Sequence, residues 1–149
     1  MAVLAASAAG GSFEAGAWYQ DLNKPEWTPP DWSFGAAWAV IYVLMAVAAW
    51  RVWQGRHSVR IGAVLWWLLI LVLNVAWSWL MFGLHRPGWA FMMSALILAV
   101  AIMCSRAFFL LSRQAGFMLL PLVLWAGFAC FLTYSVWTMN RGGFTQIFG

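Results

Sequence analysis

The chain has 149 residues, of which 65% are hydrophobic and only 8% charged, and it contains 13 Trp and 11 Phe. Soluble proteins are about 25% charged, so these few charges could not cover a water-facing surface. Intrinsic disorder is excluded as well, because disordered chains are poor in apolar and aromatic residues. The composition therefore predicts an all-α integral membrane protein with a single domain over residues 1–149.

Four uncharged runs are each long enough to cross the hydrocarbon core, which needs about 20 helical residues. They cover residues 32–50, 61–85, 87–105 and 114–140. A shorter apolar segment precedes them, and its many Ala and Gly residues would let neighbouring helices approach closely. We therefore expect a five-transmembrane-helix bundle, with helices at about residues 2–17, 34–53, 61–84, 88–111 and 115–139.

The connection at residues 18–33 differs from the other connections in length and composition. It contains Pro25, Pro29 and Pro30, which prevent a continuous helix, and three of the four acidic residues of the chain. We therefore expect a structured loop here.

The arginines predict the orientation of the bundle. With five helices, the second and fourth connections share one side, which carries five arginines and no acidic residue: Arg51, Arg56, Arg60, Arg106 and Arg113. Because Lys and Arg are enriched in cytoplasmic connections, this side is predicted to be cytoplasmic in a bacterial inner membrane. The loop at residues 18–33 and the C-terminus should then face outward. The net charge of +4 reflects this topology, and no clustered basic face predicts nucleic-acid binding.

Most catalytic and metal-binding patterns are missing from the sequence. The four long runs contain no carboxylate, which disfavours an ion-coupled transporter. His57 and His85 are single residues at predicted helix ends, and Cys104 and Cys130 lie inside apolar runs. No metal site and no cofactor are therefore expected.

Aromatic side chains recur at helical spacing inside the predicted spans. Three sets each lie on one helix face: Trp38, Tyr42 and Met45; Asn74, Trp77 and Met81; and Trp125, Phe128 and Ala129. Such stripes are more often packing residues than ligand contacts. However, a mid-membrane amide such as Asn74 needs a partner within the bundle or a cavity, and aromatic walls with a few polar groups are typical of small-molecule pockets. Trp50, Trp53 and Trp89 lie at run ends and fit an interfacial aromatic belt.

Several motifs occur in an order that matches a known family. From Trp18 the sequence has the pattern W-Y-x-x-L-x-K-P-x-W-x-P-P-x-W, followed by W-x-x-x-Y-x-x-M from Trp38. Further along are Asn74-x-x-Trp77 and Pro121-x-x-x-Trp125-x-x-Phe-Ala. From Trp18 onward the chain closely resembles the tryptophan-rich sensory protein, or translocator protein, family.

The resemblance implies a five-helix bundle, commonly a homodimer, whose first loop covers a pocket between helices as a lid. It also implies a membrane receptor, sensor or carrier that binds porphyrins, including protoporphyrin IX and haem, and other hydrophobic ligands. The alternatives are a light-dependent porphyrin-degrading enzyme, in which Trp125 would be catalytic, and a cholesterol or lipid transporter. The ligand-binding positions carried over from the family are Trp18, Trp38, Tyr42, Asn74, Trp77, Phe82, Trp125 and Ala129. The lid positions are Pro25, Trp27, Pro29 and Pro30.

Two positions depart from the family pattern. Leu122 stands where the family often has Tyr, and Thr133 stands where it often has Asn, so a pocket hydroxyl and an amide are lost. The sterol pattern L/V-x(1–5)-Y-x(1–5)-K/R also fails, because six residues separate Tyr134 from Arg141.

Overall fold

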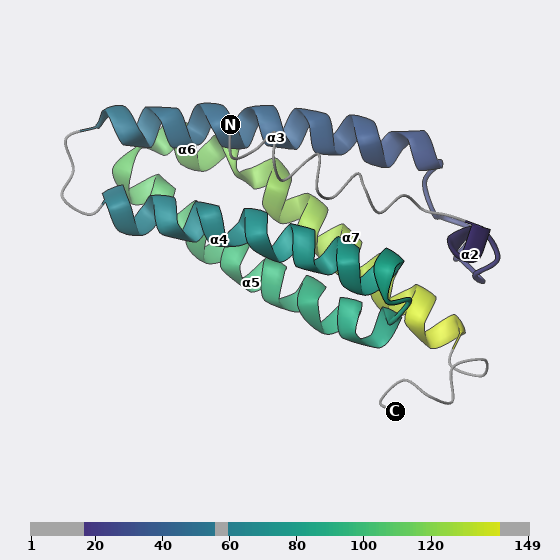
Figure 1. The fold of residues 1–149 in the computed structure, drawn as a ribbon. Helices are drawn as coiled ribbons and strands as arrows, with labels where there is room; N and C mark the ends of the chain where they lie inside the picture. The colour runs from purple at the N-terminus through teal and green to yellow at the C-terminus, as the bar shows by residue number, and fades with distance from the viewer. Residues whose placement is uncertain (1–16, 56–59, 141–149) are drawn as a thin grey trace.

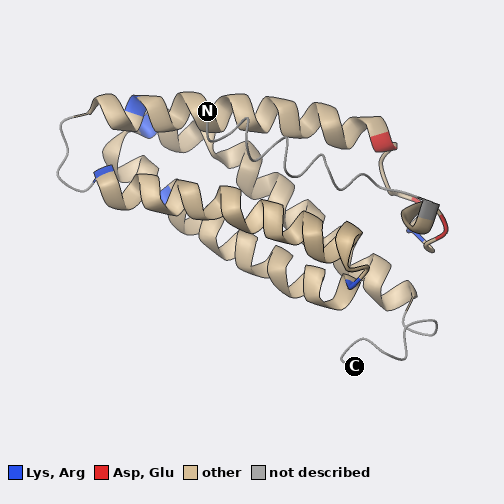
Figure 2. Cartoon of the chain, in the orientation of Figure 1, with Lys and Arg blue, Asp and Glu red and all other residues tan. Residues whose placement is uncertain are grey.

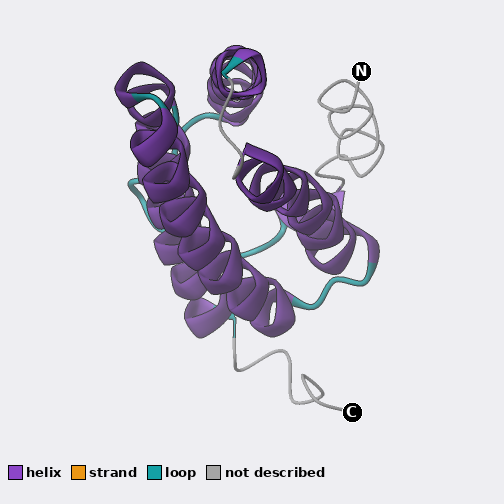
Figure 3. Cartoon of the chain, turned by 90° about the vertical axis from the view of Figure 1, so that its left-hand side faces the viewer, coloured by secondary structure: helices purple, strands orange, loops and turns teal. Residues whose placement is uncertain are grey.

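The computed structural model describes residues 17–55 and 60–140. All regular structure in these residues is helical (Figure 3), and four segments are long and apolar enough to cross a membrane. These segments are Asp31–Gln54, Arg60–Gly83, Pro87–Leu111 and Arg113–Met139. The all-helical membrane fold is thus confirmed. The predicted first helix at residues 2–17 lies outside the described residues except for Ala17, so the count of five helices stays a prediction.

Helix α5 packs against both α4 and α7, whereas α3 packs chiefly against α6 (Figure 1). In chain order the elements are α2 (Ala17–Gln20), α3 (Asp31–Gln54), α4 (Arg60–Ser78), the π-helical turn η1 (Trp79–Gly83), α5 (Pro87–Leu111), α6 (Arg113–Met118) and α7 (Leu120–Met139).

The first connection is shorter than the loop predicted at residues 18–33. Trp18 already belongs to α2, and α3 begins at Asp31, so the non-helical part covers residues 21–30. Pro30 has an extended conformation with φ −57° and ψ 145°, and its carbonyl accepts a 2.6 Å hydrogen bond from the Ser33 hydroxyl. Asp31 then lies in the first turn, where the helix dipole favours a negative charge. These interactions explain why the helix begins directly after the two prolines.

The predicted continuous helix at residues 115–139 is interrupted at Leu119, which separates α6 from α7. Pro121 accounts for the interruption, because proline has no N–H and its ring clashes with the carbonyl four residues earlier. Helix α6 itself begins at Arg113, because Ser112 is extended and its hydroxyl accepts a 3.4 Å hydrogen bond from the Ala115 N–H.

The two ends of the bundle differ in packing and in charge. We call the end with Gln54, Arg60 and Arg113 the arginine end, and the end with Asp31 and Met139 the loop end. The arginine end has most of the basic residues and no acidic residue among those described, whereas the acidic residues lie at the loop end (Figure 2). Most of the enclosed core belongs to the arginine half, since residues 31–40 of α3 include no buried residue.

Candidate ligand-binding site

Three of the predicted site residues lie together between α3 and α7. The rings of Trp38 and Tyr42 stack with centroids 5.2 Å apart and planes inclined by 28°. The Trp125 ring meets Trp38 edge to face at 6.4 Å, and it also lies 5.7 Å from the Phe34 ring. All of these rings are partly buried. The arrangement gives one aromatic wall made from two helices that are far apart in the sequence.

A second aromatic group forms around η1 and α2. The Phe82 ring lies edge to face with Trp77 at 5.7 Å and with Tyr19 at 5.5 Å. Trp18 lies against the His85 ring, with centroids 4.3 Å apart. The predicted site residues Trp18, Trp77 and Phe82 therefore belong to one hydrophobic cluster.

The π-helical turn explains how Trp77 and Phe82 meet. An α-helix turns by about 100° per residue, so residues five apart point about 140° apart. The wider turn at Trp79–Gly83 is closed by a 2.9 Å hydrogen bond from the Leu84 N–H to the Trp79 carbonyl. It brings the two rings into contact, and such turns are frequent at functional sites. Hydrophobic patterning does not distinguish α- from π-helical turns, so the sequence did not predict it.

Two phenylalanines that were not predicted as site residues connect the aromatic groups. Phe128 lies 5.3 Å from Trp125 and packs on the cluster of Trp77 and Phe82. Phe34 packs on the same cluster and also meets Trp125. Helical spacing already grouped Phe128 with Trp125, and it could also have identified Phe34, which lies one helical turn before Trp38.

Helix α4 contributes a polar pair to the site. Asn74 is buried, and its Nδ2 donates a 2.9 Å hydrogen bond to the Ile70 carbonyl of its own helix. Its Oδ1 accepts no hydrogen bond from any described residue. The Trp77 Nε1 is enclosed but has no partner within the described part of the chain. An acceptor and a donor therefore lie three residues apart on one face, and a buried donor without a partner costs about 1–3 kcal/mol.

Ala129 lies next to Phe128 on α7 and is partly buried. Its carbonyl accepts a 2.7 Å hydrogen bond from the hydroxyl of Thr133, so this hydroxyl interacts within its own helix. Thr133 therefore does not replace the family amide as a polar group of the aromatic site.

The first connection contacts α7 through both ring stacking and hydrogen bonds. Trp27 stacks on Phe131 with centroids 5.2 Å apart and planes inclined by 16°, and it meets Phe128 at 6.0 Å. The Asn140 side chain binds both backbone groups of Asn23, accepting from its N–H at 3.1 Å and donating to its carbonyl at 2.9 Å. The predicted lid position Trp27 is thus placed against a ring that itself contacts Trp125.

A backbone turn and the contacts of a lysine ammonium also order the first connection. The Thr28 N–H donates a 2.9 Å hydrogen bond to the Pro25 carbonyl, which closes a turn just before Pro29. The Lys24 ammonium donates to the Tyr19 carbonyl at 3.1 Å and lies 4.5 Å above the Tyr19 ring. Burial, and to a smaller extent the nearby Asp31 carboxylate, raises the pKa of Tyr19. The connection is therefore an ordered segment with specific contacts.

The chemistry of the site is stacking together with hydrogen bonding. No group of three His, Cys, Asp or Glu residues able to hold a metal ion occurs within residues 17–55 and 60–140. The rings offer faces and edges for aromatic contacts, and Asn74 Oδ1 and Trp77 Nε1 offer one hydrogen-bond acceptor and one donor.

Comparison with known proteins identifies the family. The TspO/MBR family model matches residues 1–138. Protein CrtK of Rhodobacter capsulatus is 36% identical over 146 residues, which cover 95% of this chain and 90% of that protein. The translocator protein of Sus scrofa is 34% identical, covering 84% of this chain and 76% of its own length. The tryptophan-rich sensory protein of Cereibacter sphaeroides is also 34% identical, with coverage of 83% and 77%. The chain therefore belongs to the TspO/MBR family of membrane proteins.

Proposed function

We propose that the protein is a membrane sensor or carrier that binds porphyrins, such as protoporphyrin IX or haem, in the aromatic site. The observation that carries this proposal is the cluster of rings from α2, α3, α4, η1 and α7, which includes Trp77, whose buried Nε1 has no hydrogen-bond partner among the described residues. A porphyrin is a large flat aromatic molecule with polar groups at its centre and edge. Its faces can stack on indole rings, and its polar groups need hydrogen-bond partners.

Each part of the site has a role in this proposal. Trp125 stacks on the macrocycle, and Trp38, whose ring is inclined by 81° to that of Trp125, meets the macrocycle with its edge. Asn74 accepts and Trp77 donates a hydrogen bond to the polar groups of the ligand. The first connection covers the bound ligand as a lid. Its prolines restrict the free conformations, which lowers the entropy lost on closure.

The most direct test compares Trp125→Phe with Trp50→Phe. Trp125 contacts Trp38, Phe34 and Phe128, whereas Trp50 is 59% exposed at the arginine end. Porphyrin titration should show a loss of up to about tenfold for Trp125→Phe, or about 1.4 kcal/mol, because stacking area and the indole N–H are lost. Trp50→Phe should bind like the parent protein. Equal affinities for the two variants would make Trp125 a packing residue.

Illumination during the same titration separates a binder from a porphyrin-degrading enzyme. A binder keeps the porphyrin absorbance in light and in darkness, whereas the enzyme loses absorbance in light, and the loss should decrease strongly in Trp125→Phe. Competition with cholesterol tests sterol transport.

We also propose a helix count, an oligomeric state and a membrane orientation for the protein. A first helix at residues 2–17 completes a five-helix bundle, which forms a homodimer. The first connection and the C-terminus face outward from a bacterial inner membrane, because Arg51, Arg60, Arg106 and Arg113 all lie at the opposite end. A reporter fused after residue 141 should be external, and one inserted at residues 55–58 should be cytoplasmic. The reverse labelling would overturn the orientation.

A further inference from the structure

The outer surface of α5 and α6 carries two arginines beside exposed apolar side chains. Arg106 and Phe109 lie three residues apart on α5, and Arg113 and Phe117 lie four residues apart on α6, so each pair shares a helix face. The two phenylalanine rings meet edge to face at 5.0 Å, which brings the two faces together. Leu110 completes the group one turn after Arg106. We call these five residues the α5–α6 patch.

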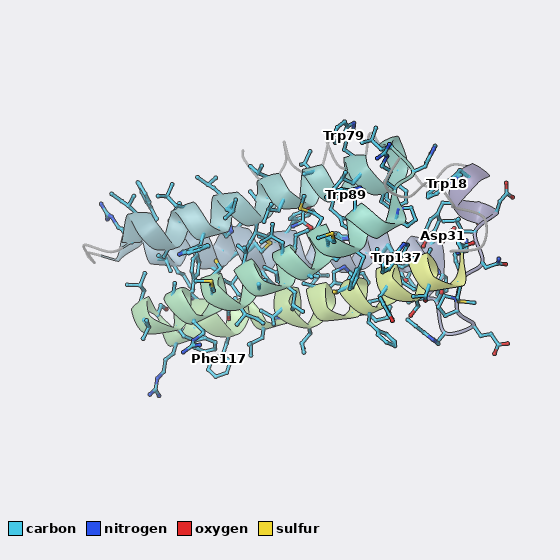
Figure 4. The ribbon with its side chains drawn as sticks, turned by 90° about the horizontal axis from the view of Figure 1, so that it is seen from below. Trp18, Asp31, Trp79, Trp89, Phe117 and Trp137 are labelled. Atoms are coloured by element: carbon cyan, nitrogen blue, oxygen red, sulfur yellow. The ribbon has the colours of Figure 1, made fainter. Side chains whose placement is uncertain are left out.

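A glycine allows the two helices to form this surface. A Cβ at Gly116 would lie 2.3 Å from the Phe109 ring, which no real contact allows. The Phe109 ring therefore packs directly on the α6 backbone. The patch therefore lies where α5 and α6 pack directly against each other. Phe117 lies on the outside of the bundle, away from Trp18 and Asp31 (Figure 4).

The apolar part of the patch is exposed far beyond what packing requires. Leu110 is 87% exposed and Phe117 is 61% exposed. Both lie at the end of a membrane-spanning segment, where acyl chains meet head groups. Acyl chains are the natural contacts of such side chains at this level.

The two arginines of the patch differ from the others described at this end. Arg51 donates to the Gln114 side chain, and Arg60 donates to the Trp53 and Gly55 carbonyls. Arg106 and Arg113 are exposed and have no hydrogen bond or ion pair with any described residue. The sequence has no acidic residue after Asp31 that could neutralise them. The positive charge is therefore available to an external anion.

We propose that the α5–α6 patch binds an anionic phospholipid. The phosphate lies between the two guanidinium groups, which suit phosphate geometry, and the acyl chains lie along Leu110 and Phe117. Arg106 is five residues before the end of α5, about 7.5 Å into the helix at 1.5 Å per residue. Its long side chain reaches the head-group level by extending toward the interface. A second copy of the same patch is a poor occupant, because like charges would face each other.

Native mass spectrometry of the full chain in a neutral detergent tests the proposal. The probes are phosphatidylglycerol and phosphatidylcholine with identical acyl chains. Phosphatidylglycerol should bind more tightly, and Arg106→Gln and Arg113→Gln should each lower its affinity by about fivefold. Neither substitution should change phosphatidylcholine binding. Arg106→Lys keeps the charge but loses the planar guanidinium, so it should bind more tightly than Arg106→Gln and less tightly than the parent protein. This series separates loss of charge from loss of folding.

Arg86→Gln is the matched control, because it removes the same charge at the loop end. It should leave phosphatidylglycerol binding unchanged, and glycerol phosphate without acyl chains should not compete at equal concentration. Equal binding of the two lipids, an equal effect of Arg86→Gln, or competition by glycerol phosphate would each overturn the proposal. A shift from dimer to monomer in Arg106→Gln, with lipid binding intact, would instead assign the patch to a second copy.

Discussion

The arginine end and the loop end of the bundle use the same helices in different ways. At the arginine end Met45, Cys104, Phe108 and Leu119 are each 0% exposed. At the loop end the rings of Trp38, Trp77 and Trp125 are only partly buried. Between helices in lipid there is no hydrophobic driving force, so close packing holds such a bundle together. The arginine end therefore supplies most of the close packing that stabilises the bundle, which agrees with the ligand-binding role proposed for the loop end.

Small side chains make the close packing possible. The arginine end includes fully buried alanines at positions 48, 101 and 115. A buried hydrogen bond adds to the packing, since Trp67 Nε1 of α4 donates to the Met45 carbonyl of α3 at 3.1 Å. The loop end also has a fully buried alanine, Ala90, but its contacts between α3 and α7 are made by large aromatic rings.

The largest expected effect is that of removing a ring from the arginine end. Phe108→Ala should lower the free energy of unfolding by about 3 kcal/mol, because it leaves a cavity in an enclosed core. Porphyrin affinity per folded molecule should not change. Thermal unfolding and porphyrin titration measure the two quantities.

Phe128→Ala is the matching substitution at the loop end. It should weaken porphyrin binding while costing less stability than Phe108→Ala, because Phe128 is only partly buried. If both variants lose the same stability and neither loses porphyrin affinity, the two ends do not differ in the way proposed.

The second effect concerns the prolines of the first connection. Replacing Pro29 and Pro30 together by Gly should weaken porphyrin binding by about 1 kcal/mol, or about fivefold, because the free connection gains conformations. The affinity is measured by titration, and circular dichroism checks that helicity is retained. Unchanged affinity in the folded double variant would make the segment a simple connector.

Loss of the buried hydrogen bond between α4 and α3 should change stability alone. Its effect should be similar to, or smaller than, that of the proline substitutions. Trp67→Phe should lower the free energy of unfolding by about 1 kcal/mol, because the Met45 carbonyl loses its donor from α4. Trp66→Phe is the control, since the neighbouring indole is only partly buried. An unfolding experiment that gives equal losses for the two variants would show that the hydrogen bond contributes nothing beyond ring packing.

The smallest effect is expected for the link between the first connection and α7. Asn140→Ala removes both side-chain hydrogen bonds to Asn23, which are exposed and so contribute about 0.5 kcal/mol. Porphyrin should dissociate about twofold faster, which stopped-flow absorbance can measure. A Thr138→Ala variant, whose hydroxyl donates only to the Ser135 carbonyl of its own helix, should dissociate like the parent protein.

The sequence predicted the four long spans because charges are absent over membrane-length runs. It also predicted that Trp38 and Tyr42 share a face, since helical spacing determines this within one helix. Hydropathy reports the length of a span but not its backbone hydrogen bonding. The π-helical turn and the interruption at Leu119 were therefore missed, although Pro121 was visible.

Contacts between helices were the second feature that could not be predicted from the sequence alone. Phe34 and Phe128 have ordinary positions on their own helices, and their connecting role appears only when α3 and α7 come together. The hydrogen bonds between Asn23 and Asn140 were hidden for the same reason. The resemblance to the family identified Trp125 and Trp77 as site residues, but whether they contact a ligand stays a prediction.

The hydrogen bonds of Asn140 have a consequence for the order of events during synthesis. They join positions 117 residues apart, which is most of the chain. At about 5–20 residues per second, Asn140 leaves the ribosome roughly 6–23 s after Asn23. Throughout this interval the first connection has no Asn140 to bind. A chain that stops before Asn140 therefore cannot form the hydrogen bonds that join this connection to the end of α7.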